Sequence, residues 1–311
     1  MAPDQPMIGL VVVSLMWGST ATLIKIALAG ASPLYVTAAR VITSSLVLLP
    51  IAWHRLRRNP SRGRATRENI RHLMVLSIVL VLAPYALASW GQQYVTASLA
   101  SVLNATIPLW TIIFAALHTR TSPRRRQAIG IITGLAGVVV LVGLHPSDLQ
   151  ADTLLAVAAL SVASASRGFG YLYLHHNVSQ LPPLQIAATT QSMAAAMLLP
   201  VLADTGGQAF TPGTIGALAA LGVIATAGAQ LLNYHNIARL GPTTASLSTY
   251  LISIFGVAIA VVSLGEALTA QIVAGTAIIL GSVALAFRRD PKPQTSDRQP
   301  ASSDPTTVSD R

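Results

Sequence analysis

The chain has 311 residues, of which 52% are hydrophobic and only 10% are charged. Soluble domains carry about 25% charged residues, so this composition argues against a water-soluble globular protein. The chain has no cysteine, which excludes disulfides and thiolate metal sites, and its formal net charge is +10.

Long apolar runs follow one another along nearly the whole chain, and about 20 residues cross roughly 30 Å of hydrocarbon. The ten runs are residues 7–28, 34–53, 73–90, 98–117, 128–144, 154–174, 184–203, 213–236, 244–264 and 270–287. They lack the period-two alternation of barrel strands. We therefore expect an all-α polytopic membrane protein with ten transmembrane helices. The first run has Asp4 and no base before it, so we expect a mature helix and not a signal peptide.

The basic residues are confined to alternate loops and the tail. Seventeen of the 20 Lys and Arg residues lie there: Arg55, Arg57, Arg58, Arg62, Arg64, Arg67, Arg71, Arg120, Arg124, Arg125, Arg126, Arg239, Arg288, Arg289, Lys292, Arg298 and Arg311. These loops share one side of the bilayer if both termini are cytoplasmic, as the positive-inside rule requires. We expect a multi-pass protein of the cell inner (plasma) membrane, with a disordered cytoplasmic tail at 289–311. The basic residues then serve topology and anionic lipid contact, and no nucleic-acid partner is expected.

Short sequence matches relate the two halves of the chain. Pro33-Leu34 recurs as Pro183-Leu184, and Leu48-Leu49-Pro50 recurs as Leu198-Leu199-Pro200, both 150 residues later. Five spans per half is an odd number, so the second copy must run through the membrane in the opposite sense. We expect two inverted five-helix repeats, at 1–145 and 152–288. Such repeats are typical of transporters that open a midplane site alternately to each side.

The first and sixth spans carry polar groups near their centres. Trp17 and Gly18 lie roughly 15 Å into the first span, and their repeat mates are Arg167 and Gly168. Membrane tryptophans favour the interfaces, so a central Trp17 is a candidate for lining a cavity. The glycines indicate either close helix packing or a backbone gap beside a substrate.

Arg167 is the strongest single signal, because a guanidinium near mid-membrane is costly unless it has a partner or a wet cavity. No acidic residue lies within any predicted span. Arg167 therefore either contacts the substrate, directly or through water, or snorkels toward the cytoplasmic surface. Lys25 and Arg40 are nearer the helix ends, where snorkelling is cheap. They could alternatively help to draw in anions or take part in gating.

Further polar residues are candidates for the cavity wall. The predicted substrate-binding residues are Trp17, Tyr85, Asn104, Trp110, Arg167, Tyr171, Asn233, Tyr234 and Tyr250. Pro108 lies between Asn104 and Trp110, where a missing N–H can kink the helix. His175 and His235 can titrate near neutrality and are candidates, with Lys25 and Arg40, for gating or proton coupling. No acid or cysteine accompanies the histidines at ligand spacing, so we expect no metal and no cofactor.

Several stretches resemble the EamA-type family of the drug/metabolite transporter superfamily, over roughly residues 8–287. The resemblance is carried by Trp17-Gly18-Ser19, Arg40, the stretch TASLASVLNATIP at 96–108 and Leu264-Gly265-Glu266. The corresponding first-half turn, Leu117-His118-Thr119-Arg120, lacks the Gly-Glu pair, which favours a turn role for Glu266. The family implies small-metabolite transport through a central cavity, often the export of amino acids. Within it this chain is similar to the YddG-like aromatic amino-acid exporters, which no motif separates from threonine/homoserine or cysteine exporters.

The leading functional hypothesis is an inner-membrane exporter of aromatic or neutral amino acids or related small metabolites, working by alternating access as a monomer. A carrier of anionic metabolites, such as sugar phosphates or nucleotide sugars, stays open because of Lys25, Arg40 and Arg167. A membrane enzyme or scaffold acting on an anionic lipid head group is the alternative from another class. The chain has no Walker loop, GxSxG or HExxH motif, so we expect no enzyme.

Overall fold

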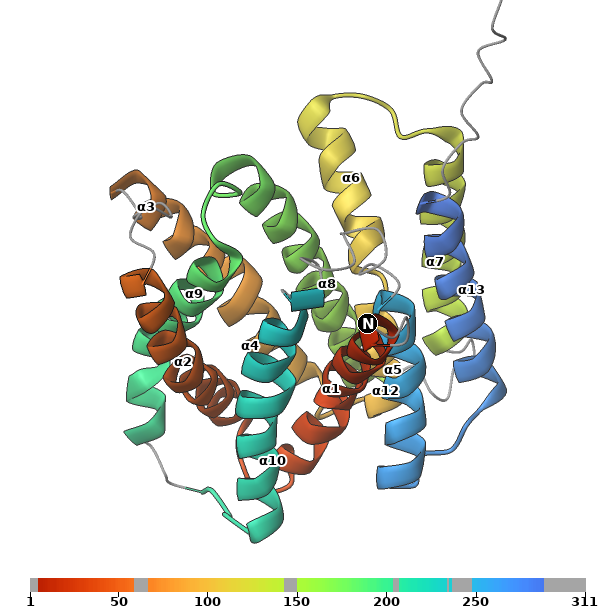
Figure 1. The fold of residues 1–311 in the computed structure, drawn as a ribbon. Coiled ribbons are helices and arrows are strands. Elements are labelled where there is room, and N and C mark those ends of the chain that lie inside the picture. The colour runs from red at the N-terminus through yellow and green to blue at the C-terminus, as the bar shows by residue number, and fades with distance from the viewer. Residues whose placement is uncertain are drawn as a thin grey trace, which may run out of the picture.

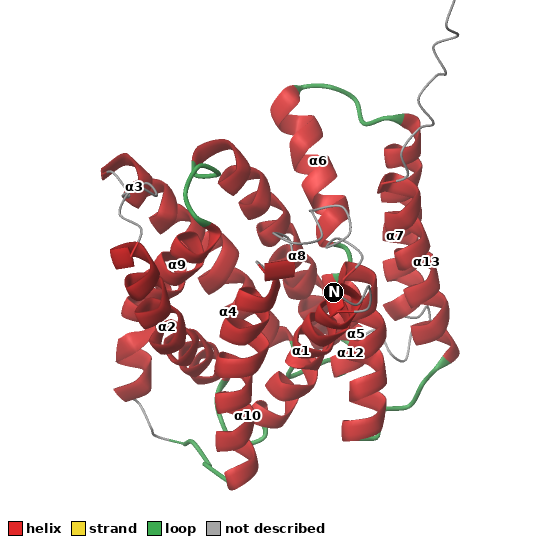
Figure 2. Ribbon diagram, viewed as in Figure 1, coloured by secondary structure: helices red, strands yellow, loops and turns green. Residues whose placement is uncertain are grey.

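The computed structural model describes residues 5–58, 67–142, 150–203, 207–233, 235–236 and 248–287. This part of the chain is helical and contains no strand, which confirms the predicted fold class (Figures 1 and 2). Nine of its helical runs are long and apolar enough to cross a membrane, and Leu251–Leu264 is a shorter apolar helix. The protein is a polytopic helical membrane protein of about ten spans.

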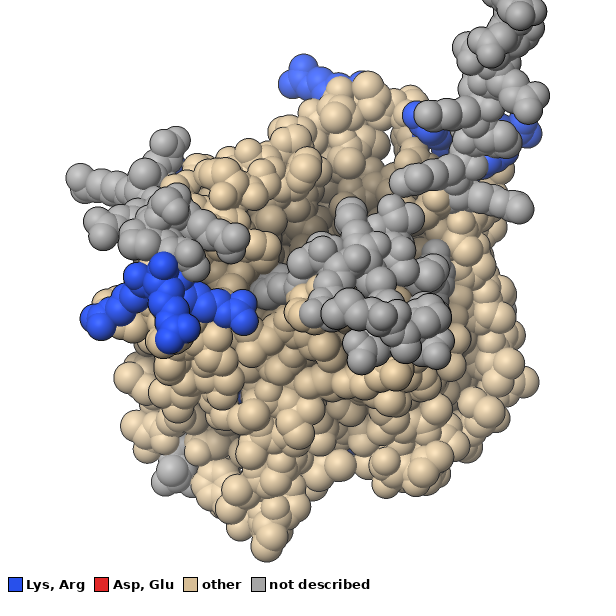
Figure 3. Space-filling view, in the orientation of Figure 1, with Lys and Arg blue, Asp and Glu red and all other residues tan. Residues whose placement is uncertain are grey.

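The spans follow one another in antiparallel order. Their elements are α1 (Gln5–Leu28), α2 (Pro33–Arg58), α3 (Arg67–Leu76), η1 (Ser77–Leu82), α4 (Ala83–Gly91), α5 (Ala97–Asn104), α6 (Ile107–Thr119), α7 (Arg125–Val142), α8 (Ala151–Asn177), α9 (Pro183–Leu198), η2 (Leu199–Ala203), α10 (Pro212–Gly222), η3 (Val223–Gly228), α12 (Ser248–Leu264) and α13 (Ala270–Phe287). The end at which α2 finishes and α7 begins is called the basic end. Its described arginines form blue groups in Figure 3, where the surface between them is hollowed.

The fourth span is interrupted at Pro108, as the sequence predicts. Helix α5 stops at Asn104, and α6 starts at Ile107 with the proline in its first turn. Proline has no N–H to continue the hydrogen-bond ladder, so the helix breaks one turn earlier. At the break the Leu103 carbonyl accepts hydrogen bonds from the backbone N–H and the hydroxyl of Thr106, at 3.1 Å and 2.7 Å, and from the Ser164 hydroxyl of α8, at 3.1 Å. A polar contact between the fourth and sixth spans therefore lies at the break.

The third and eighth spans each contain a π-helical turn, η1 and η3, at corresponding places. Such turns disturb the regular ladder and are frequent at functional sites. In η1 the Val79 carbonyl accepts a hydrogen bond from the Ser166 hydroxyl, at 2.6 Å. In η3 the Thr226 hydroxyl accepts one from Nε of Arg40, at 2.8 Å. Each π turn thus supplies an oxygen to a neighbouring span.

The inner helices form two groups. In group A, α1 packs along α10 and α12; in group B, α8 packs along α4 and α6. The outer helices pair as α2 with α9 and α7 with α13, and both pairs are visible in Figure 1. The first span thus packs against the eighth and ninth spans, and the sixth span packs against the third and fourth. Two related half-chains would give this reciprocal arrangement.

Glycines allow the inner helices of each group to approach closely. A Cβ at Gly18 would lie 3.1 Å from the backbone nitrogen of Gly256 in α12. A Cβ at Gly168 would lie 2.8 Å from Cβ of Trp110 and 2.9 Å from the backbone nitrogen of Thr111. Real Cβ atoms essentially never come as close as the contacts at Gly168, and few come as close as 3.1 Å, so both central glycines serve close helix packing.

Replacing Gly168 by alanine should therefore destabilise the bundle. The backbone of α6 cannot yield as a flexible side chain would, so we expect Gly168→Ala to cost about 1–3 kcal/mol. Thermal unfolding in detergent, followed by loss of the monodisperse species, measures the change. Gly281→Ala is the matched control, because nothing lies within 4 Å of a Cβ built there. Equal unfolding temperatures for Gly168→Ala and the control would refute the close-packing account.

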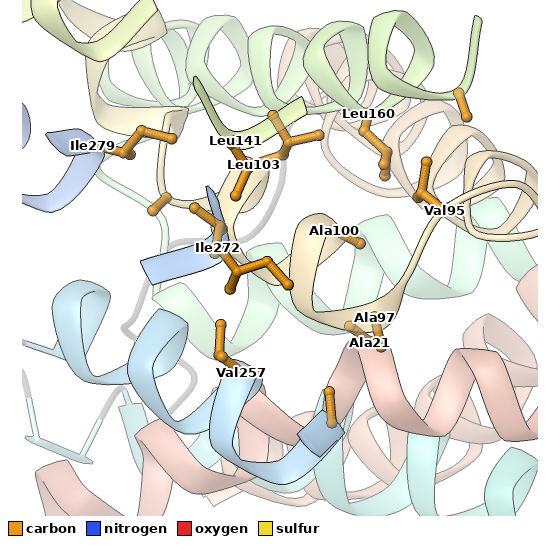
Figure 4. Close-up of a cluster of buried hydrophobic side chains, with 14 residues drawn as sticks. Ala21, Val95, Ala97, Ala100, Leu103, Leu141, Leu160, Val257, Ile272 and Ile279 are labelled. Atoms are coloured by element: carbon orange, nitrogen blue, oxygen red, sulfur yellow. The ribbon is translucent and has the colours of Figure 1, made fainter. Parts of the chain in front are cut away.

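The two groups meet at the end opposite the basic loops. A buried apolar cluster there takes Ala21 from α1 and Val257 from α12 on the group A side. From group B it takes Leu160 of α8, and between the groups it takes Ala97 and Leu103 of α5, which packs against α12, α1 and α8; these residues are drawn in Figure 4. Small side chains on α5 let the helices come together. The described residues therefore close this end, whereas the basic end is hollowed.

Candidate functional site

Two arginines lie on either side of one tyrosine in the interior of the bundle. The guanidinium carbon of Arg40, from α2, lies 3.8 Å from the ring centroid of Tyr85 in α4. The guanidinium carbon of Arg167, from α8, lies 5.2 Å from the same centroid. Both distances are within the range of a cation–π contact. We call Arg40, Tyr85 and Arg167 the arginine site.

Arg40 is held in place and shielded. Its side chain is 3% exposed, its Nε donates to Thr226, and its guanidinium stacks on the Tyr85 ring. The Thr226 hydroxyl in turn donates to the Leu221 carbonyl, at 2.7 Å. A desolvated cation–π contact is worth about 2 kcal/mol and compensates part of the burial of the guanidinium. Arg40 therefore acts as a fixed positive charge behind the tyrosine and not as a freely moving side chain.

Arg167 is half-buried and has one side-chain partner of known geometry. Its Nη1 donates to Oδ1 of Asn104, the last residue of α5, at 3.1 Å. Tyr171 lies one helical turn further along α8 and interacts electrostatically with Arg167 and Tyr85. Half of the Tyr171 surface, 51%, is nevertheless accessible. Arg167 therefore lies near an accessible tyrosine on the same helix.

The arginine site contains no negative charge. The sequence has no acidic residue between Asp4 and Glu68, between Glu68 and Asp148, or between Asp152 and Asp204. These stretches include α2, α4 and all of α8 beyond its first turn, which holds Asp152 at the opposite end from Arg167 and Tyr171. An arginine at a helix centre costs about 2.5–3.5 kcal/mol on insertion scales, and two of them repel each other. An anionic group supplied by a ligand would offset the cost of burying each arginine and would reduce the repulsion between the two. The site is therefore suited to binding an anionic group.

Two features of the site were missed by sequence reasoning. Gln191 of α9 is fully buried, approaches the Tyr85 hydroxyl, and has no hydrogen bond of good geometry on either side-chain atom. A glutamine in the middle of an apolar span is a signal in the sequence that points to such a buried polar residue. Thr226 was not foreseeable, because its role depends on the π turn and on Arg40 arriving from another span.

The structure brings together four of the predicted substrate-binding residues, namely Tyr85, Asn104, Arg167 and Tyr171, and adds Arg40. Trp110 lies against Gly168, one residue from Arg167. Trp17 and Asn233 are half-buried, and no polar contact joins either to Arg167 among the described residues. Tyr234 and the Tyr250 side chain lie outside the described residues.

The predicted gating residues fall at three places. Arg40 belongs to the arginine site, and Lys25 lies at the closed end, where its Nζ donates to the carbonyls of Gln92 and Val95. His175 is exposed at the end of α8, beside His176, and His235 is also exposed. Among the described residues, no contact joins either histidine to Arg40 or Tyr85.

A helical membrane bundle that carries cationic side chains in its interior is typical of proteins that move solutes across a membrane. The chain belongs to the EamA-like transporter family, whose model matches residues 5–143 and again residues 154–288. The same model thus matches twice, once in each predicted repeat. Family membership points to a transporter and not to an enzyme.

Relatives with this organisation occur in bacteria and archaea. The chain is 22% identical over 278 residues to an uncharacterized transporter of Archaeoglobus fulgidus, covering 88% of this chain and 95% of the relative. It is 21% identical over 193 residues to the uncharacterized transporter YoaV of Bacillus subtilis, covering 62% and 65%. It is 26% identical over 197 residues to the uncharacterized inner membrane transporter YedA of Escherichia coli K12, covering 63% and 61%. The last two matches span less than two thirds of the relatives' length.

A solved crystal structure has the same fold, with a TM-score of 0.64 and 16% sequence identity. The match covers 92% of this chain and 97% of the other. The whole bundle, and not one half, therefore has a structural counterpart. The protein is a multi-pass membrane protein of a transporter family.

Proposed function

We propose that the protein exports amino acids, aromatic and neutral ones above all, or related small metabolites, by alternating access through the central hollow. The observation that carries this proposal is the unneutralised arginine site beside an accessible hollow. Arg167, oriented by Asn104, is placed to bind the substrate carboxylate. Arginine presents a planar donor fork that matches a carboxylate.

Aromatic walls support the choice of side chain. Tyr85 and the accessible Tyr171 lie near Arg167, and Trp110 packs next to it. Rings of this kind accept apolar and aromatic groups by offset stacking. A substrate with a carboxylate at one end and an apolar side chain at the other would satisfy both features, as in the YddG-like exporters that the sequence resembles.

Alternating access is supported by the packing pattern. The exchange of partners between spans one and six, and the double family match, fit two inverted repeats at 1–145 and 152–288. We further propose that both termini are cytoplasmic, as the basic loops indicate. The hollowed basic end then faces the cytoplasm, so the described conformation would admit solute from inside.

A second candidate is favoured by Arg40. Two cations flank Tyr85, and a single carboxylate neutralises only one of them. A sugar phosphate or a nucleotide sugar would bring more negative charge to the same place. The candidates therefore differ in the charge of the substrate and not in the site.

Flux measurements on purified protein in liposomes separate these candidates. The panel contains phenylalanine, tryptophan, threonine, glucose 6-phosphate and a nucleotide sugar, each with and without a pH gradient, and protein-free liposomes are the control. Flux of the aromatic amino acids is the expected result. Flux of the phosphates alone would favour the second candidate. Lipid turnover or head-group binding without any solute flux would contradict both and favour a membrane enzyme or scaffold.

A further inference from the structure

The closed end carries a set of polar contacts that the arginine site does not involve. Both oxygens of the Glu266 carboxylate, in the turn after α12, accept hydrogen bonds from the first turn of α5. Oε1 accepts from the Ala97 backbone N–H at 2.7 Å, and Oε2 accepts from the Ser98 N–H at 2.9 Å. The Lys25 ammonium, near the end of α1, donates to the Gln92 carbonyl at 2.7 Å and to the Val95 carbonyl at 2.9 Å.

These contacts match the charge of the helix ends that they touch. Gln92 is the C-cap of α4, where free carbonyls carry partial negative charge and favour a cation. Ala97 is the first residue of α5, where free N–H groups carry partial positive charge and favour an anion. The connection at residues 92–97 is therefore held by the Lys25 ammonium where α4 ends and by the Glu266 carboxylate where α5 begins. Such charge-assisted hydrogen bonds are among the strong ones.

The contacts of Lys25 cross between the two groups of inner helices, from α1 of group A to the end of α4 in group B. Glu266, in the turn after α12 of group A, holds the start of α5, which packs against α12, α1 and α8. Beside this turn lies the apolar cluster in which Ala21 and Val257 of group A meet Ala97 (Figure 4). At this end α1 cannot separate from α4 without breaking the Lys25 contacts, and α5 cannot leave the turn after α12 without breaking the Glu266 contacts.

We propose that Lys25 and Glu266 form a latch that keeps the end opposite the basic loops closed and opens when solute leaves there. The inference rests on the proposed alternating access. It also accounts for the single Gly-Glu turn, since the corresponding first-half turn ends in Thr119-Arg120 and offers no carboxylate to the basic end. The two ends are thus built differently, although the half-chains are related in sequence.

Cysteine labelling tests the latch without any need for a known substrate, because the chain has no cysteine of its own. Tyr171→Cys places one reporter thiol in the hollow. Its reaction with a membrane-impermeant maleimide is measured in intact cells and in inside-out vesicles. In the otherwise unchanged chain we expect fast labelling from the basic end and slow labelling from the opposite end.

Adding Glu266→Gln keeps the shape of the side chain but removes its charge, and Lys25→Met removes the ammonium. A hydrogen bond to a charged group contributes about 1.5–3 kcal/mol, so each change should speed labelling from the opposite end about tenfold. Labelling from the basic end should stay the same. Asp152→Asn is the matched control, because Asp152 is an exposed acid at the same end, in the first turn of α8.

Three results would overturn the latch. Unchanged labelling from the opposite end in both variants is the first, and an equal increase with Asp152→Asn is the second. Faster labelling from both ends is the third, because it would mean that the contacts stabilise the fold as a whole. Failure of the proposed function is read separately, as absence of flux in the liposome panel with the labelling pattern intact.

Discussion

Arg167→Gln should abolish transport, with flux of the preferred substrate in liposomes falling at least about a hundredfold. Glutamine keeps a polar side chain of similar reach but removes the charge and the donor fork. A carboxylate would then lose a charge-assisted, two-point contact in a site with no other exposed cation, which is worth about 3 kcal/mol. Folding should be preserved, because the lost protein contacts are one hydrogen bond to Asn104 and the cation–π contact with Tyr85 at 5.2 Å.

Arg71→Gln is the matched control for this change, since Arg71 is exposed at the basic end. Both variants are compared by initial flux and by elution as a monodisperse species in detergent. If Arg167→Gln transported at the rate of the control, Arg167 would be a structural residue and not a substrate ligand. Loss of flux together with loss of the folded species would point to the same structural role.

Arg40→Met should remove transport and leave the unfolding temperature unchanged or higher. Replacing a buried charge that has no acidic partner by an apolar side chain of similar volume is often neutral or stabilising. Thr226 keeps its hydrogen bond to the Leu221 carbonyl, so no buried hydroxyl is left without a partner. The loss of a fixed charge behind Tyr85 should nevertheless weaken anion binding at least about tenfold, because Coulomb energies at such distances are of the order of 1–2 kcal/mol even in a polar interior.

Arg57→Met provides the comparison for Arg40→Met. Arg57 lies on the same helix, is exposed, and also stacks on an aromatic ring, with its guanidinium carbon 4.6 Å from the ring centroid of Trp53. We expect it to leave the flux unchanged. A lower unfolding temperature for Arg40→Met together with normal flux would mean that Arg40 stabilises the fold. The sign of the change in unfolding temperature therefore distinguishes a structural role from a role in anion binding.

Much of the architecture could be predicted from residue chemistry alone. The apolar runs locate the spans because a backbone in hydrocarbon must satisfy its hydrogen bonds within a helix. The kink at Pro108 follows from the missing N–H. The free-energy cost of an arginine near the middle of the membrane indicates that Arg167 faces a polar interior. These inferences use properties of single residues, which is why they could be made without coordinates.

Other features depend on contacts between distant segments. Arg40 was placed among snorkelling residues because its depth along α2 was known but its neighbours were not. Its burial results from Tyr85 on α4 and Thr226 in a π turn, and no local pattern predicts that turn. Glu266 was assigned to a turn, which is where it lies, but its bonds to Ala97 and Ser98 require the pairing of two loops far apart in sequence.

The central claim is that the arginine site binds the negative charge of the substrate. Calorimetric titration of the purified protein with the best substrate of the panel, and with the same molecule converted to its uncharged carboxamide or dephosphorylated form, tests it most directly. We predict that the charged molecule binds, that the uncharged one binds at least about tenfold more weakly, and that Arg167→Gln removes the difference. Equal affinity for both molecules in the unchanged protein would contradict the account.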